Sequence, residues 1–202
     1  MTGRAVVAAV TSAAHHRRRE EATVSAAAAT LHRLEHGATV EEVLAFFDGL
    51  PAVTVEEMLG RWAGGEVPTG HPMDGLLGRF GWHGKRFDSP DDVHPLVMDR
   101  PRGGTFSLDP ALVPLPLLLH HPAVLRRPAL ARAARALGPA LGTRSPKARL
   151  RMTEHRGVVS ATMCYDDRPI HDVFRKVDDD TVLGLMDLRG LDRPFAFVLR
   201  RE

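Results

Sequence analysis

The chain has 202 residues, of which 44% are hydrophobic and 26% are charged, with 27 Lys and Arg against 25 Asp and Glu. This composition is typical of a soluble globular protein with one core, and the net charge of +2 excludes a generally basic nucleic-acid coat. The charge is uneven, however. No Asp or Glu occurs from Pro110 to Thr153, where eight basic residues contribute +8 against −6 in the rest of the chain.

Residues 1–20 are predicted to be a disordered tail. Their apolar stretch, Ala5 to Val10, is shorter than the ~7–15 residues of a signal-peptide core. The chain has no apolar run near the ~18 residues that span a bilayer. A single cysteine, Cys164, cannot form an internal disulfide. We therefore expect a cytoplasmic protein.

Residues 21–50 are predicted to form N-terminal helices. Thr39 followed by Glu41 and Glu42 is typical of a helix start, and Gly49 is typical of a helix end.

Residues 51–109 are rich in glycine and predict short strands joined by tight turns. The strands are expected at Gly60–Val67, Trp82–Phe87, Val93–Met98 and Thr105–Leu108, with a brief helix at Met73–Phe80.

Residues 110–146 are predicted to be a basic, apolar helical insertion. Pro114, Pro116, Pro122 and Pro128 exclude one continuous helix. In its second part, helical spacing places one apolar face, made of Leu130, Ala133, Ala134, Leu137 and Leu141.

Residues 147–202 alternate between apolar and polar side chains and predict an antiparallel meander of five strands. With the earlier strands this makes about eight or nine, enough to close a barrel. The expected class is mainly β, of the α+β type: an antiparallel barrel with N-terminal helices and a helical insertion.

Gly60-Arg61-Trp62-Ala63-Gly64 and Gly81-Trp82-His83-Gly84-Lys85-Arg86-Phe87 resemble the bacterial GXWXG family. The stretches Ser160–Met163, Asp172–Asp178 and Gly184–Asp187 resemble its companion C-terminal domain of unknown function.

The resemblance implies a lipocalin-like (calycin-like) barrel and no assigned biochemistry. It also implies structural roles for Gly60, Trp62 and Gly64, with Trp62 at the barrel base under a C-terminal arginine. Either Arg200 or Arg201 can take that place, and we name Arg200.

The best polar-site signal lies in the strand at Ile170–Val177, where Asp172, Phe174 and Lys176 share one face. Inside a barrel, Asp172 and Lys176 must pair or bind something, because an unpaired buried charge is costly. A structural ion pair and a ligand-binding role are both open. The predicted ligand-binding residues are aromatic wall positions and polar anchors: Trp82, Phe87, Phe174 and Phe195, with Lys85, Asp172 and Lys176.

A second possible polar site is the turn with Thr69, Gly70, His71 and Asp74. It can bind a carboxylate or phosphate at a helix start, or simply cap that helix. No zinc-type histidine spacing is present, so we predict no metal and no cofactor.

These features favour a protein that binds a small molecule, holding an apolar or anionic amphiphilic ligand (fatty acyl, lipid or aromatic) in a barrel pocket. One alternative is a cofactor-free isomerase or hydrolase that uses an Asp/Lys or His/Asp pair. Another is a module that meets an anionic membrane through residues 110–151. The basic segment has no aromatic residues between Phe106 and Tyr165, which argues against nucleic acid. The oligomeric state is not predicted.

Overall fold

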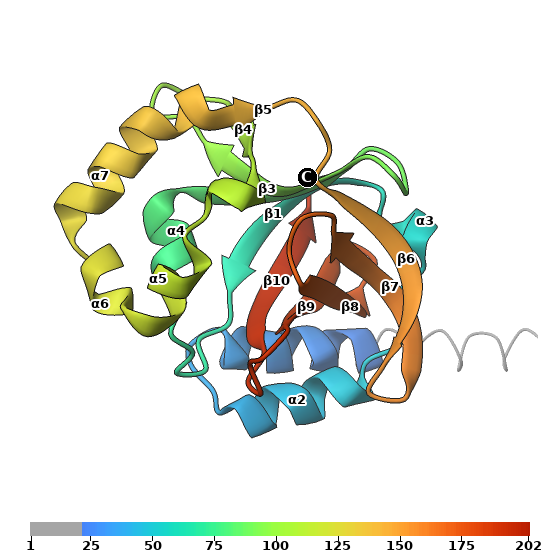
Figure 1. Cartoon of the computed structure of the whole chain (residues 1–202). Helices are drawn as coiled ribbons and strands as arrows, with labels where there is room; N and C mark the ends of the chain where they lie inside the picture. Colours follow the sequence, from blue (N-terminus) through green and yellow to red (C-terminus); the bar gives the residue numbers. More distant parts are fainter. Residues whose placement is uncertain (1–21) are drawn as a thin grey trace, which may run out of the picture.

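A computed structural model describes residues 22–202; the predicted tail of residues 1–20 lies outside the described part. One antiparallel sheet of ten strands dominates the fold (Figure 1). Its strands are β1 (Gly60–Glu66), β2 (Trp82–Phe87), β3 (Val93–Asp99), β4 (Thr105–Leu108), β5 (Gly142–Thr143), β6 (Ala148–His155), β7 (Val158–Tyr165), β8 (Ile170–Asp178), β9 (Thr181–Leu188) and β10 (Phe195–Arg201).

Eight of these strands close into a barrel. The order β2-β1-β10-β9-β8-β7-β6-β3 returns to its start because β3 also pairs with β2. Strands β4 and β5 extend the sheet from β3 outside the closed ring. The predicted antiparallel barrel and the strands of the C-terminal meander are therefore confirmed.

The N-terminal helices cover the outer face of the barrel. Residues 22–34 and α2 (Val40–Gly49) pack their buried side chains on the outer faces of β8, β9 and β10 (Figure 1). Thr39 is the N-cap of α2 in a capping box with Glu42, as its sequence indicated. This cover explains why β9 and β10 are apolar on both faces.

Two glycines of the barrel make room for bulky neighbours. A Cβ on Gly64 would lie 2.3 Å from the Trp82 indole, and one on Gly84 would lie 1.9 Å from the Trp62 carbonyl oxygen. Gly84 has a φ of +156° and lies where the β2–β3 register shifts. The glycines thus let the first two strands approach closely around Trp82.

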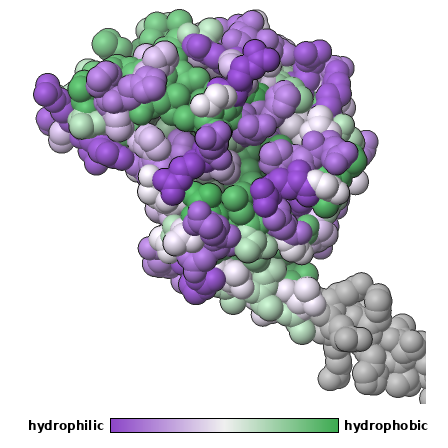
Figure 2. All heavy atoms as spheres, turned by 60° about the horizontal axis from the view of Figure 1, so that its bottom comes forward, coloured by the Kyte–Doolittle hydropathy of each residue, from purple (hydrophilic) through white to green (hydrophobic). Residues whose placement is uncertain are grey.

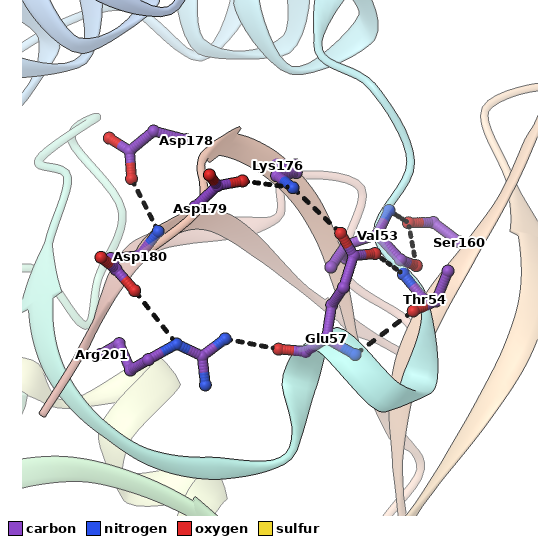
Figure 3. A network of polar contacts seen from close by, with 9 residues as sticks. All are labelled: Val53, Thr54, Glu57, Ser160, Lys176, Asp178, Asp179, Asp180 and Arg201. Carbon is purple, nitrogen blue, oxygen red and sulfur yellow. Dashed lines mark hydrogen bonds and ion pairs between the residues drawn. The ribbon is translucent and has the colours of Figure 1, made fainter.

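The short helix α3 (Val55–Met58) closes one end of the barrel. Trp62 is buried there and donates its indole N–H to the Met58 carbonyl at 2.8 Å. The Arg201 guanidinium lies 4.3 Å from the centre of the Trp62 ring and donates to the Glu57 and Leu59 carbonyls. Figure 3 shows Arg201 reaching between Glu57 of α3 and Asp180.

The choice of Arg200 for this role was wrong. Trp62 pairs with Arg201 across β1 and β10, so the next side chain, that of Arg200, points to the outer face. There Arg200 forms an ion pair with Glu35 at 2.8 Å.

The insertion forms a roof over the other end. It comprises the 3₁₀ turn η1 (Pro110–Leu112), α5 (Leu115–His120), α6 (Pro122–Leu125), α7 (Pro128–Leu137) and the 3₁₀ turn η2 (Gly138–Leu141). With α4 (Leu76–Phe80) it lies on the side of the barrel away from α3, on the left in Figure 1. Arg168 holds its start through the carbonyls of Pro110, Ala111 and Val113.

Replacing Arg201 with Met is expected to lower the free energy of unfolding by on the order of 2 kcal/mol, because a cation–π contact and two charge-assisted hydrogen bonds are lost. Arg200→Met is the matched control and is expected to cost no more than about 1 kcal/mol, since it loses one surface ion pair. Urea denaturation of both variants measures the difference. Equal losses would contradict the assignment of Arg201 to the base.

Candidate functional site

A cavity of about 510 Å³ lies between the barrel interior and the roof. Its floor and walls come from strands, including Trp82, Met98, Phe195 and Phe197. Its roof comes from η1, α5, α7 and η2, which contribute mostly leucine and alanine side chains. The predicted apolar face of the insertion lines this cavity with all its members: Leu130, Ala133, Ala134, Leu137 and Leu141.

An ion pair lies in the cavity wall. Lys85 of β2 and Asp172 of β8 point inward, and Lys85 Nζ lies 2.7 Å from Asp172 Oδ2. The two side chains are 3% and 2% exposed. Because a buried charge without a partner is costly, each group requires the other.

The Lys85 ammonium also contacts a backbone carbonyl and three aromatic rings. It donates to the Pro95 carbonyl at 3.2 Å. It lies 4.9 Å from the ring centre of Phe197, 5.7 Å from that of Trp82 and 5.8 Å from that of Tyr165. An ammonium group has three N–H donors, so the carboxylate, the carbonyl and the aromatic faces account for its charge.

The Asp172 carboxyl is held in an unusual electrostatic environment. Burial raises its pKa above the ordinary aspartate value, while the adjacent Lys85 opposes that rise. The Tyr165 hydroxyl lies 3.5 Å from Asp172 Oδ2, and burial together with the nearby carboxylate holds the pKa of Tyr165 well above its ordinary value. The Asp172 carboxyl can therefore exchange hydrogen bonds with a molecule in the cavity.

Two buried polar atoms of the cavity lining have no hydrogen-bond partner in the described structure. They are Asp172 Oδ1, an acceptor, and Trp82 Nε1, a donor. Buried polar groups in native proteins are nearly always paired, so these two atoms call for a partner.

The predicted ligand residues divide into two groups. Trp82, Lys85, Asp172 and Phe195 line the cavity. Phe87 and Phe174 instead meet edge to face, 5.9 Å apart, in the filled part of the barrel below it.

Lys176 is not a partner of Asp172. It lies at the α3 end, where its ammonium pairs with Glu57 at 3.0 Å and Asp179 at 2.7 Å (Figure 3). Alternation along β8 correctly put the two side chains on one face, but their separation along the strand brings Lys176 to the solvent at the base.

The turn at Thr69, Gly70, His71 and Asp74 uses its backbone amides internally and leaves Thr69 Oγ1 and Asp74 Oδ1 buried without a hydrogen-bond partner in the described structure. Asp74 Oδ2 accepts from the backbone N–H groups of Thr69 and His71, both at 2.9 Å. His71 Nδ1 accepts from the Met73 N–H, and burial lowers the pKa of His71. The amides of this turn that would bind an anion are therefore already occupied. The turn does not cap α4 either, because the Gly75 and Gly78 N–H groups at the start of that helix donate to Glu66.

Sequence reasoning missed Tyr165, Phe197 and Arg168 as residues of the cavity lining. The signal for the first two was the period-two alternation itself, since Tyr165 follows Met163 and Phe197 follows Phe195 on the inward faces. Arg168 lies in a turn and gave no such signal.

Within 22–202, no three His, Cys, Asp or Glu side chains gather as a possible metal site. No helix in that range is long and apolar enough to cross a membrane.

The fold and the cavity together define a class of protein: a closed eight-stranded antiparallel barrel whose interior cavity is covered by a helical insertion. Two family models match the chain, "GXWXG protein" over residues 45–103 and "Domain of unknown function (DUF4334)" over residues 146–201. The chain belongs to the GXWXG family and carries its companion domain. Most of the roof falls between the two matched segments.

A solved structure is also similar. It is the crystal structure of a protein from Thermomonospora curvata, which is 36% identical and has a TM-score of 0.59. The match covers 79% of this chain and 85% of that chain. A search of curated proteins finds no match.

Replacing Lys85 with Met is expected to lower the free energy of unfolding by about 3–5 kcal/mol, because it leaves Asp172 charged and unpaired in an apolar interior. Lys176→Met is the control and is expected to cost no more than about 1 kcal/mol, since its ion pairs are solvent-exposed. Thermal and urea denaturation measure both.

The double variant Lys85→Met with Asp172→Leu separates two causes of lost stability: the unpaired charge of Asp172 and the changed packing at residue 85. It is expected to recover most of the stability, because both charges are gone. A double variant as unstable as Lys85→Met would contradict this explanation.

Proposed function

We propose that this protein binds a small, largely apolar molecule in the cavity between barrel and roof. The single observation that carries the proposal is the cavity itself: about 510 Å³, lined mainly by leucine, alanine, methionine and aromatic side chains, with a few polar groups in its wall. Binding sites for drug-sized molecules have this size and composition.

The arrangement of the two ends supports binding of a ligand from the roof side. The α3 end is filled by Trp62, Met58 and Arg201. The roof side is lined by leucines that are also partly open to solvent, with Leu112 at 53% and Leu137 at 67% exposure. Apolar side chains at the mouth of an apolar cavity provide a route inward.

Binding is favoured over catalysis by the state of Asp172. One of its oxygens is held by Lys85 at 2.7 Å, so this oxygen is engaged and is not presented to a molecule in the cavity, although burial raises the pKa of the carboxyl. Lys85 Nζ is in turn engaged by that carboxylate and by the Pro95 carbonyl, so it is not presented to a molecule in the cavity.

The proposal is tested with N-phenylnaphthylamine, an uncharged apolar dye whose fluorescence rises on transfer from water. Binding at micromolar concentration is expected for the full chain. Ala134→Phe, which fills the cavity from α7, is expected to weaken binding about tenfold. Ala136→Phe is on the same helix, exposed and away from the cavity lining, and is expected to leave binding unchanged. Equal effects of the two variants, or no binding by the parent protein, would overturn the proposal.

A further inference from the structure

We infer that the cavity wall around Asp172 recognises an uncharged polar group that both donates and accepts a hydrogen bond, such as an alcohol or a primary carboxamide. This inference rests on the proposed function and specifies the polar end of its ligand. Its starting point is the pair of unpartnered buried atoms, Asp172 Oδ1 and Trp82 Nε1.

The two atoms differ in what they require. A carboxylate oxygen only accepts, so Asp172 Oδ1 needs a donor from the ligand. An indole N–H only donates, so Trp82 Nε1 needs an acceptor. Both side chains line the same cavity, and both lie near Lys85. The Lys85 Nζ atom is 2.7 Å from Asp172 Oδ2 and 5.7 Å from the centre of the Trp82 ring. A hydroxyl or carboxamide can supply both roles.

The charge balance excludes an ionised group at this position. Lys85 and Asp172 cancel each other, and Lys85 has no vacant donor direction once Asp172, the Pro95 carbonyl and three aromatic rings are counted. A ligand carboxylate here would meet the like charge of Asp172 in an apolar interior, which is strongly unfavourable. The sequence-based expectation of an anionic ligand is therefore not retained for this part of the cavity.

The cavity lining has two further cations, Arg135 and Arg168, and Arg168 is engaged by backbone carbonyls of the insertion. The experiment must therefore separate Arg135 from Lys85. Arg135 of α7 lines the cavity near the roof, beside Gly81. A fatty-acid carboxylate held there would point away from Asp172. Arg135→Gln removes that possibility without changing the Asp172 environment.

The test uses displacement of N-phenylnaphthylamine by dodecanol, dodecanamide and dodecanoate at about pH 8, where the carboxylate is ionised. In the Arg135→Gln protein, dodecanol and dodecanamide are expected to bind about tenfold more tightly than dodecanoate. Asp172→Asn removes the negative charge and frees Lys85, so it is expected to reverse this order in favour of dodecanoate. Trp82→Phe removes the indole N–H donor and is expected to weaken the binding of dodecanamide.

The outcomes distinguish a failure of this inference from a failure of the proposed function. Dye binding with dodecanoate preferred in the Arg135→Gln protein, or with dodecanol affinity unaffected by Asp172→Asn, overturns the inference and leaves the proposed function standing. Dye binding without displacement by any of the three compounds also overturns the inference. Absence of dye binding overturns the proposed function itself. Because the selectivity is measured in a protein with Asp172 intact, the result does not depend on Asp172→Asn folding.

A separate observation points to a partner surface: we infer that the part of the roof around the cavity mouth docks on an anionic lipid bilayer. Among the described residues, eight large apolar side chains are exposed, and five of them lie in the insertion: Leu112, Val124, Leu130, Leu137 and Leu141. All of these but Val124 also line the cavity, so they surround its mouth. Figure 2 shows green apolar atoms beside purple hydrophilic ones on the upper-left lobe, where Figure 1 places α5–α7.

The charge of this surface indicates the partner. Within the described chain, Arg127, Arg132 and Arg144 are exposed and form no ion pair, and the insertion contains no acidic residue. By contrast, Lys147, Arg149 and Arg151 are neutralised by pairs such as Arg151–Asp91 at 2.6 Å. Unpaired cations beside exposed leucines are complementary to acidic lipid headgroups above an apolar layer. The surface is thus confined to the roof rather than to all of residues 110–151.

Co-sedimentation with vesicles tests this inference. The full chain is expected to bind vesicles of phosphatidylcholine with phosphatidylglycerol about tenfold more tightly than pure phosphatidylcholine, and added salt is expected to weaken the binding. Leu137→Ser with Leu141→Ser is expected to abolish most of it. Met152→Ser with Val159→Ser, two exposed apolar residues outside the roof, is the matched control and is expected to have no effect.

Three results would overturn the membrane inference. They are absence of binding to the anionic vesicles, equal loss in the control variant, and a change of oligomeric state on gel filtration in place of a change in vesicle binding. The last would assign the surface to a second copy of the chain.

Discussion

Closure of the barrel at its α3 end is the constraint on which the rest of the structure depends. Trp62 on the first strand and Arg201 on the last stack 4.3 Å apart, and the guanidinium also ties down the carbonyls of α3. This contact joins the two ends of the barrel sequence and fills one end of its interior. The space that remains can open only toward the other end, which is where the cavity lies.

That other end is covered by a segment that the family models do not include. The roof lies between the two matched regions, and its apolar face lines the cavity while its outer surface carries unpaired arginines. The uneven charge of the chain is thus a property of one structural part. The +8 segment divides into a roof with exposed cations and a strand whose cations are neutralised by neighbouring aspartates.

The buried Lys85–Asp172 pair gives the cavity its chemical character. A cavity with only apolar side chains in its wall would accept any apolar molecule of suitable volume. A neutral ion pair with one unpaired oxygen, in the same cavity lining as an unpaired indole N–H, calls for a specific pattern of donor and acceptor. Such groups in an apolar site contribute mainly to selectivity. A ligand that leaves them unpaired binds more weakly, because the cost of their desolvation is not offset by a hydrogen bond.

The sequence by itself determined the strands, the barrel class, the apolar face of the insertion and the inward direction of Asp172, since all of these follow from local periodicity and glycine or proline positions. It could not determine which charges pair. Lys85 and Asp172 are far apart in the chain and meet only because β2 and β8 face each other across the closed barrel. Lys176, two residues beyond Phe174 on the correct face, reaches solvent at the base instead. In the same way, one residue of register decided that Arg201 and not Arg200 covers Trp62, because adjacent side chains on a strand point to opposite faces.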